Sequence, residues 1–465
     1  MNGTRFFAPQ AWVGDGWQRD VLLAVDAAGR WSSIATDAAP ASRGDAIVLD
    51  GAVLPGLVDA HSHAFQRAIA GLTEQAAAGG DDFWSWRDRM YSAALRITPR
   101  QLESIAAFLY AELLAGGYTQ VCEFHYLHNA VPGAPAADPL EMSMALVRAA
   151  QRTGIGLTLL PTLYMRSGFG AKGLRDDQRR FASTPDSIAR LVQDLRRETR
   201  GLANVQAGVA VHSLRAADEG AIRDVAAFAA AGGLPVHIHV AEQTREVQDC
   251  LEHTGRRPIE WLLEHVAVDA RWNLVHATHT VAEELQGVSE RGASIVICPS
   301  TEANLGDGVF DLPGCAAAGG GWSVGSDSHV TRSWTEELRL LEYSQRLVRH
   351  RRNVAAQAAG RPSSAAALFD AALAGGPAAA GCPVGGIALG QRADLTVLDA
   401  KSPALLGVPP ANLLDAAVFS SPGAAFRQVH VAGRPVAGGP DGPAAGPSRE
   451  IVADYAAAMQ QLWSA

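Results

Sequence analysis

Lysine is almost absent from this sequence of 465 residues, in which only Lys172 and Lys401 occur. Arginine therefore carries nearly all the positive charge, and the formal net charge is -9. This balance gives no indication of nucleic-acid binding, so we expect no nucleic-acid partner. An anionic ligand would have to be recognised by a local cluster of arginines.

Cysteine is also sparse, and its five positions show no Cys-X-X-Cys spacing. An odd number without such spacing argues against a disulfide framework, so we expect a cytoplasmic protein. No uninterrupted apolar run approaches the ~20 residues that a membrane span needs. The segment Met1–Arg5 does not open a long apolar stretch, so we expect no signal peptide and no membrane partner.

Both ends of the chain contain short β-type stretches, at residues 17–25, 46–49, 393–399 and 427–433. The middle contains eight apolar runs that are typical of buried strands, at residues 52–60, 119–124, 157–163, 205–211, 234–240, 273–276, 294–298 and 322–325. Between most of them, apolar residues recur at three- and four-residue spacing. This spacing predicts helices at residues 102–114, 140–150, 187–198, 222–231 and 282–290, with 336–347 and 451–462 further on.

Eight strands alternating with helices predict an α/β fold, a TIM-like (β/α)8 barrel with a small β-sandwich domain built from both termini. A doubly wound open sheet is the alternative, but no Gly-X-Gly-X-X-Gly follows the first run. We expect residues 1–54 and 385–440 to form the small domain and residues 55–384 the barrel. Residues 441–465 are expected to form a linker and a last helix.

Metal-type residues follow the predicted strands at the end where a barrel carries its chemistry. The first run leads into His61 and His63, and the fifth contains His239. The sixth run ends at His276, and the eighth leads into Asp327. One histidine at a strand end is commonly structural, but such residues on four strands indicate a metal site.

Three imidazoles and a carboxylate predict a site for one divalent metal ion with room for water, and Zn²⁺ is the expected ion. Such an ion lowers the pKa of its water toward ~7. Glu242 lies three residues after His239, where it can carry a proton between the water and a leaving group. The plainer interpretation of Glu242 is an acid near a helix N-terminus. Fe²⁺ and Mn²⁺ suit the same ligands, so the metal's identity stays open.

The sequence resembles the amidohydrolase superfamily in its branch of mononuclear deaminases. The resemblance rests on residues 55–63, His239-X-X-Glu242, His276, Ser326-Asp327, residues 390–395 and residues 429–434. It implies that His61, His63 and His239 bind the metal, and that Asp327 completes the sphere and takes the water's proton. It further implies that Glu242 shuttles this proton and that His276 polarises the attacked group.

Many binuclear members of that superfamily bridge two metals through a modified lysine at the fourth strand. The two lysines of this sequence, Lys172 and Lys401, fall in a predicted loop and outside the predicted barrel. A two-metal hydrolase is therefore disfavoured.

Several short sequence segments resemble the formimidoylglutamate deiminases, which are iminohydrolases of one histidine-degradation route. These segments are residues 61–67, 82–87, 122–126, 212–215, 326–329 and 333–334. The family reaction converts N-formimino-L-glutamate and water to N-formyl-L-glutamate and ammonia. This substrate carries two carboxylates, for which Arg87 and Arg215 are the candidate partners. The same resemblance assigns polar contacts to Gln66, Tyr126 and His212.

Three other functions are compatible with parts of this pattern. A nucleobase or nucleoside deaminase would share the metal site but would need aromatic stacking rather than two arginines. A chlorohydrolase-type enzyme would act on a neutral ring, and a non-catalytic scaffold would have no need of the ligands and Glu242. The family resemblance suggests a homodimer. The roles of His237, His279 and His329 stay open.

Overall fold

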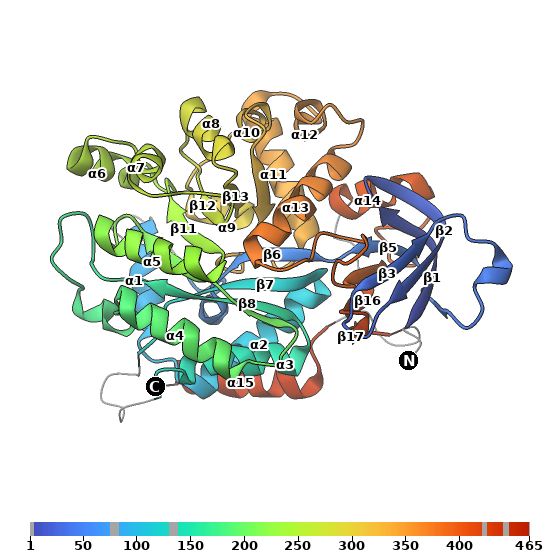
Figure 1. Ribbon diagram of the computed structural model, residues 1–465, viewed down its shortest axis with the longest axis horizontal. Coiled ribbons are helices and arrows are strands. Elements are labelled where there is room, and N and C mark those ends of the chain that lie inside the picture. The colour runs from blue at the N-terminus through green and yellow to red at the C-terminus, as the bar shows by residue number, and fades with distance from the viewer. Residues whose placement is uncertain (1–3, 75–82, 130–137, 421–425, 440–445, 465) are drawn as a thin grey trace.

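The centre of the computed structural model, which describes residues 4–74, 83–129, 138–420, 426–439 and 446–464, is a barrel of parallel strands (Figure 1). Its strands pair in the order β6 (Leu57–Ser62), β7 (Tyr118–His125), β8 (Gly156–Leu163), β10 (Val209–Ser213), β11 (Val236–Val240), β12 (Trp272–His276), β13 (Ser294–Ile297) and β14 (Gly321–Val324). A parallel bridge between Ser62 and Asp327 joins the two ends of this order and nearly closes the barrel. The predicted barrel is confirmed.

Two of the predicted runs form two strands each rather than one. The first divides into β5 (Ala52–Pro55), which belongs to another sheet, and β6 of the barrel. A Cβ atom on Gly56, between them, would lie 2.3 Å from the side chain of Thr119, so only glycine fits this crossing. The fourth run divides at Gly208 into β9 (Val205–Ala207) and β10.

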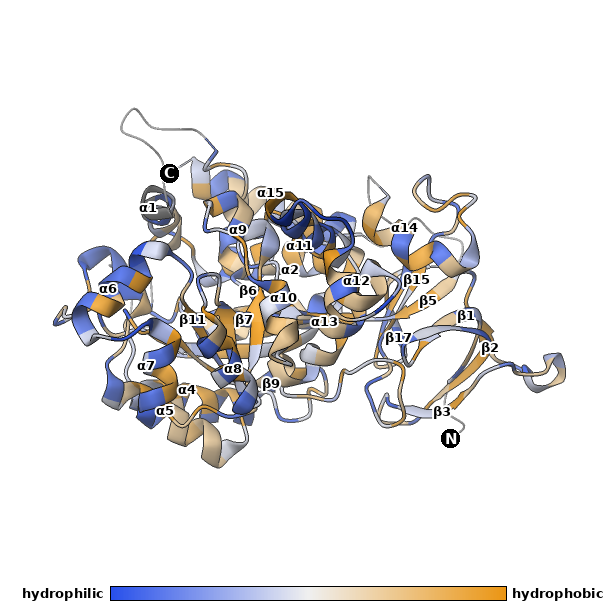
Figure 2. Ribbon diagram, turned by 90° about the horizontal axis from the view of Figure 1, so that it is seen from above, coloured by the Kyte–Doolittle hydropathy of each residue, from blue (hydrophilic) through white to orange (hydrophobic). Residues whose placement is uncertain are grey.

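Helices cover the outside of the barrel, with polar residues on their outer faces and apolar strands inside (Figure 2). The predicted helices appear as α2 (Pro99–Ala115), α3 (Glu141–Thr153), α4 (Pro185–Glu198), α5 (Glu219–Gly232), α8 (Ala282–Glu290), α11 (Trp334–Arg349) and α15 (Arg449–Trp463). Further helices are α1 (Phe83–Ala94), α6 (Thr244–Thr254), α7 (Pro258–His265), α9 (Pro299–Leu305), α10 (Leu312–Ala317), α12 (Val354–Ala358), α13 (Ser364–Ala380) and α14 (Leu413–Phe419). Short 3-10 segments include η2 (Ala64–Ala68) and η3 (Asp176–Phe181).

Helix α13 closes the N-terminal end of the barrel. The last carbonyl groups of a helix have no partner within the helix. Here Thr158 donates to the Ala380 carbonyl at 2.7 Å, and the ring of His237 lies 2.9 Å from the Ala379 carbonyl. The barrel side chains therefore satisfy the end of α13, and they leave the opposite end of the barrel for the site.

A second sheet is built from both ends of the chain, as predicted (Figure 1). It consists of β1 (Arg5–Val13), β2 (Gly16–Val25), β3 (Trp31–Ala35), β4 (Ile47–Val48), β5, β15 (Leu395–Leu398), β16 (Phe426–Val431) and β17 (Arg434–Gly438). This sheet has a small apolar core of its own, around Phe6, Leu23 and Trp31. Buried Arg392 links it to the barrel, because it donates to Asp394 at 2.6 Å and to Gln120 at 2.8 Å.

The last helix, α15, packs on α2. The rings of Phe108 and Tyr455 stack with their centroids 4.1 Å apart, and Arg67 of η2 donates to the Tyr455 hydroxyl at 3.1 Å. Residues 440–445 of the predicted linker lie outside the described residues. In the part of the chain that is described, no helix is both long and apolar enough to cross a bilayer.

Candidate active site

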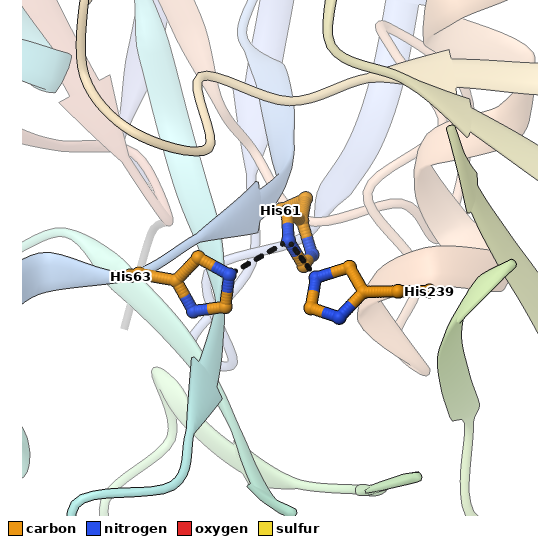
Figure 3. A group of neighbouring side chains, drawn as sticks. All are labelled: His61, His63 and His239. Atoms are coloured by element: carbon orange, nitrogen blue, oxygen red, sulfur yellow. Dashed lines mark hydrogen bonds between the residues drawn. The ribbon is translucent and has the colours of Figure 1, made fainter. Parts of the chain in front are cut away.

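Three histidines meet at the C-terminal end of the barrel strands (Figure 3). The Nε2 atom of His61 lies 3.1 Å from Nε2 of His63 and 2.9 Å from Nε2 of His239. All three side chains are buried. Three ring nitrogens turned toward one point cannot all donate to one another, whereas a cation there can bind the lone pairs of all three.

Backbone carbonyl groups fix the orientation of two of these rings. Nδ1 of His63 lies 2.9 Å from the Phe124 carbonyl, and Nδ1 of His239 lies 2.9 Å from the His212 carbonyl. Each Nδ1 therefore donates, which leaves the lone pair on Nε2. Burial lowers the pKa of His61 to about 3 and also lowers the pKa of His63 and of His239. The three imidazoles are neutral near pH 7 and suited to bind a metal.

The carboxylate of Asp327 completes this cluster. Its Oδ1 atom lies 3.5 Å from Nε2 of His61 and 3.4 Å from Nε2 of His63. Burial opposes ionisation, but the contact with the His61 ring and the nearby positive charge of His276 lower the pKa of Asp327 below its usual value. An ionised carboxylate with three neutral imidazoles fits a divalent ion that keeps one position for water.

Strained backbone is concentrated around the cluster. Five non-glycine residues at the ends of β11, β12 and β14 have φ between 50° and 70°: Ala241, His276, Ala277, Asp327 and His329. Each such residue costs on the order of 1–3 kcal/mol and persists only where its surroundings hold it. The surroundings here include Asp59, which accepts from Ser326 N at 2.8 Å and from Ser326 Oγ at 2.6 Å. Such concentrated strain is typical of a functional site.

Glu242 and His276 form a carboxyl–imidazole pair beside the cluster. Oε1 of Glu242 lies 3.7 Å from Nε2 of His276, and Oε2 lies 4.0 Å from Arg215. Burial raises the pKa of Glu242 against the opposing charges of His276 and Arg215. Burial lowers the pKa of His276, but Glu242 and the neighbouring carboxylates raise it above its usual value overall. The pair can therefore hold and pass a proton near neutral pH.

The five predicted substrate-binding residues line one small cavity together with the cluster. This cavity has a volume of about 50 Å³, and its wall includes Gln66, Arg87, Tyr126, His212 and Arg215. The amide of Gln66 donates to the Tyr126 hydroxyl at 3.2 Å. Burial lowers the pKa of His212 well below its usual value, so this ring is neutral. The structure thus brings every predicted site residue to one place, while their individual roles stay predictions.

Several residues that line or support the site were not predicted, because nothing in the sequence pattern distinguishes them. Tyr91 and Tyr164 line the cavity, their hydroxyls lie 3.1 Å apart, and Gln178 donates to both. Oε1 of Glu302 lies 3.4 Å from Nδ1 of His276 and helps to orient that ring. Cys298 has its thiol within 4.8 Å of ligand atoms of His276 and Asp327.

The three histidines of open role do not join the cluster. His237 faces α13, as described above. His279 binds the Asp307 carbonyl at 2.8 Å. His329 binds the carbonyl of His63 at 3.0 Å and the Ser326 hydroxyl at 3.1 Å. His329 therefore braces two segments that carry cluster residues.

Comparisons with known proteins show which family this chain resembles over most of its length. A formimidoylglutamate deiminase from Pseudomonas aeruginosa is 47% identical over 92% of this chain and 93% of its own length. The crystal structure of an amidohydrolase from Brucella melitensis has a TM-score of 0.90 at 40% identity, covering 99% of both chains. A zinc-bound adenosine deaminase from Xanthomonas campestris, 20% identical with a TM-score of 0.80 over 100% of this chain and 99% of its own, shares the fold. The model of the Amidohydrolase family matches residues 52–436, and the chain belongs to this family.

Proposed function

We propose that this chain hydrolyses N-formimino-L-glutamate to N-formyl-L-glutamate and ammonia, a reaction of histidine degradation. The relative from Pseudomonas aeruginosa supports this substrate. Within the structure, the observation that carries the proposal is one cavity whose wall holds His63 and His239 of the cluster and two arginines, Arg87 and Arg215. The cluster suits hydrolysis of a carbon–nitrogen bond, and the arginines suit the two carboxylates of this substrate.

The metal site of this proposal consists of His61, His63, His239 and Asp327, holding one Zn²⁺ ion. The family is metal-dependent, and the converging Nε2 atoms fit such an ion. When bound, the ion supplies a Lewis acid that lowers the pKa of water at the site.

The chain's own residues would move the protons. Asp327 accepts a proton from the attacking water, whose oxygen bonds to the formimino carbon. Glu242 passes this proton to the terminal nitrogen, which gives a tetrahedral species with one hydroxyl and one amino group. As the hydroxyl oxygen forms the C=O bond, its proton follows the same route through Asp327 and Glu242 to the amino nitrogen, the bond from carbon to that nitrogen breaks, and ammonia leaves. His276, which lies beside Glu242 and Glu302, donates a hydrogen bond to the attacked group and so polarises it.

The substrate's glutamate part would lie against the two arginines. Arg215 is well suited to this role, because burial lowers its pKa but Glu246 and Glu242 raise it above its ordinary value. Its guanidinium therefore stays charged inside the cavity, and paired hydrogen bonds from it can fix a carboxylate. Gln66, Tyr126 and His212 would supply the remaining polar contacts.

The test is ammonia release from N-formimino-L-glutamate by the zinc-loaded protein, with Arg87→Ala and Arg215→Ala beside it. We expect fast release by the wild type and a loss in kcat/KM of roughly 100-fold or more in each variant, since each leaves a carboxylate unpaired. Arg190→Ala, on the exposed side of α4, is the matched control and should behave like wild type. Removal of the metal by a chelator should abolish release, and added Zn²⁺ should restore it.

Absence of ammonia release from protein that carries one metal per chain would contradict the substrate. The same protein would then be assayed with guanine and adenosine derivatives, because a nucleobase or nucleoside deaminase is the alternative. Activity on these compounds that does not depend on Arg87 and Arg215 would favour that alternative.

We propose a cytoplasmic homodimer, on the basis of cysteine usage and family resemblance. We also propose that the chain divides into domains at residues 54, 384 and 440. Size-exclusion chromatography with light scattering would test the dimer.

A further inference from the structure

A second cavity of about 280 Å³ lies beside the catalytic cavity, which has a volume of about 50 Å³. Arg87 and Arg215 belong to the walls of both cavities. The outer wall is completed by Arg245 and Asp249 of α6 and by the loop Ser167–Phe169 after β8. The two arginines of the proposed carboxylate clamp therefore separate an inner catalytic space from a larger outer one.

Positive charge is graded along this outer cavity. The side chain of Arg245 is 66% exposed, whereas that of Arg215 is 12% exposed beside Glu242. One acidic group, Asp249, faces the same space, and its Oδ2 lies 3.8 Å from Nε of Arg245. Among the residues that the structure describes, the wall thus has three guanidinium groups and one carboxylate. An anion that enters from solvent meets Arg245 before it reaches the buried arginine.

The formal net charge of the whole chain is -9, so an anion is not attracted by the molecule as a whole. A local positive cavity can overcome this repulsion, because field lines are concentrated in a recess with low-dielectric walls. The inner cavity, at about 50 Å³, is much smaller than the outer one. The outer cavity offers the volume and the charge for a first encounter.

We propose that the outer cavity is an anion-binding vestibule, in which a dicarboxylate is held by Arg245 before it moves to Arg87 and Arg215. The dicarboxylate nature of the ligand rests on the proposed function. Arg245 is in this view a capture residue, which affects the binding of substrate and not the chemical step. Asp249 lowers the affinity of the vestibule for this ligand, because its carboxylate repels the ligand's carboxylates.

The first test is steady-state kinetics with N-formimino-L-glutamate at low and high NaCl concentration. We expect Arg245→Gln to lower kcat/KM roughly three- to tenfold at low salt through KM, with kcat unchanged, as a lost charge at this range implies. Salt screens exposed charges, so the difference from wild type should shrink as NaCl rises. Asp249→Asn should shift KM in the opposite direction.

Arg256→Gln is the matched control, because Arg256 is a half-exposed arginine on the segment after α6 that pairs with Glu264 at 2.9 Å and lines neither cavity. It changes the net charge as Arg245→Gln does, so an equal effect of the two variants would overturn the vestibule. A fall in kcat instead of a rise in KM would also overturn it.

The second test does not depend on turnover. Glutarate, a dicarboxylate without a formimino group, would be titrated into the metal-loaded proteins by isothermal calorimetry. We expect Arg245→Gln to bind glutarate several-fold more weakly than wild type and Arg256→Gln to bind it equally well. Equal binding by wild type and Arg245→Gln would refute the vestibule, whereas a wild type without ammonia release would refute the proposed function alone.

Discussion

Glu242 is the side chain on which the proposed proton transfer depends most. It is 5% exposed, it faces His276 and Arg215, and burial raises its pKa. We expect Glu242→Gln to lower kcat by roughly 100- to 10,000-fold, because the amide keeps the shape of the side chain but cannot carry a proton. Metal content should stay at the wild-type level, since Glu242 is outside the ligand set. Ammonia release and elemental analysis of the purified variant measure both quantities.

The control for this variant is Glu252→Gln, an exposed glutamate on α6. It should retain wild-type kcat. Loss of the metal from Glu242→Gln, or retention of wild-type activity, would contradict the assigned proton transfer.

The cluster was predictable from the sequence because its residues follow strand ends, where strand alternation and barrel geometry bring them together. His61, His63, His239 and Asp327 all lie where this rule places them. Tyr91, Tyr164 and Glu302 could not be found in this way, because no spacing distinguishes a tyrosine or glutamate of a cavity wall from one of the core. Arg87 and Arg215 were predicted only through family resemblance, and the cavity they share with the cluster needed the structure.

The contact between strands β6 and β14 positions His61. A Cβ atom on Gly325, directly after β14, would lie 2.6 Å from Cβ and 2.8 Å from N of His61. We expect Gly325→Ala to push these strands apart and to weaken metal binding at least tenfold. Disturbing the contacts that orient a metal ligand typically lowers metal affinity by about this factor. Overpacking should also lower stability by about 1–3 kcal/mol. Metal affinity by competition with a chelator and thermal unfolding measure the two effects.

Gly321→Ala is the control on the same strand, because the nearest atom to its new Cβ would be Ser294 Oγ at 3.8 Å, an ordinary contact. It should bind metal like wild type. If Gly325→Ala bound metal as tightly as Gly321→Ala, the close approach to His61 would have no part in shaping the site.

Apolar patterning found the barrel strands and seven helices, but it was no complete guide, because the amphipathic helix α6 was not predicted. The eight barrel runs were found because strands buried on both faces are continuously apolar. Helix α13 was missed because Ser364–Ala380 consists mostly of alanine and other small or apolar residues, and its buried surroundings leave no polar face. The divisions at Gly56 and Gly208 follow from close contacts with distant residues, which no local pattern reports.

Two histidines outside the cluster connect the stability of the chain to pH. Burial lowers the pKa of His128 and of His430 from 6.5 to about 4. His128 lies at the end of β7, where its ring binds the Thr162 carbonyl at 2.9 Å, and His430 belongs to β16 of the second sheet. Between pH 6.5 and 4, each of these residues binds a proton in the unfolded chain but not in the folded one. Stability therefore rises with pH in this window.

The metal-free protein should accordingly lose stability as the pH falls from 6.5 toward 4, by about 3 kcal/mol for each such histidine at the end of the window. The apparent midpoint of thermal unfolding, measured at one scan rate from pH 7 to pH 4.5, reports this contribution, which Asp59 and Glu123 partly offset because burial raises their pKa values to about 7 and about 8. His430→Gln, whose amide can still donate to Gln428 as the ring does at 3.2 Å, should fall less steeply than wild type, because one titrating group is removed. Equal slopes for the two proteins would mean that His430 is protonated in the folded state as readily as in the unfolded one.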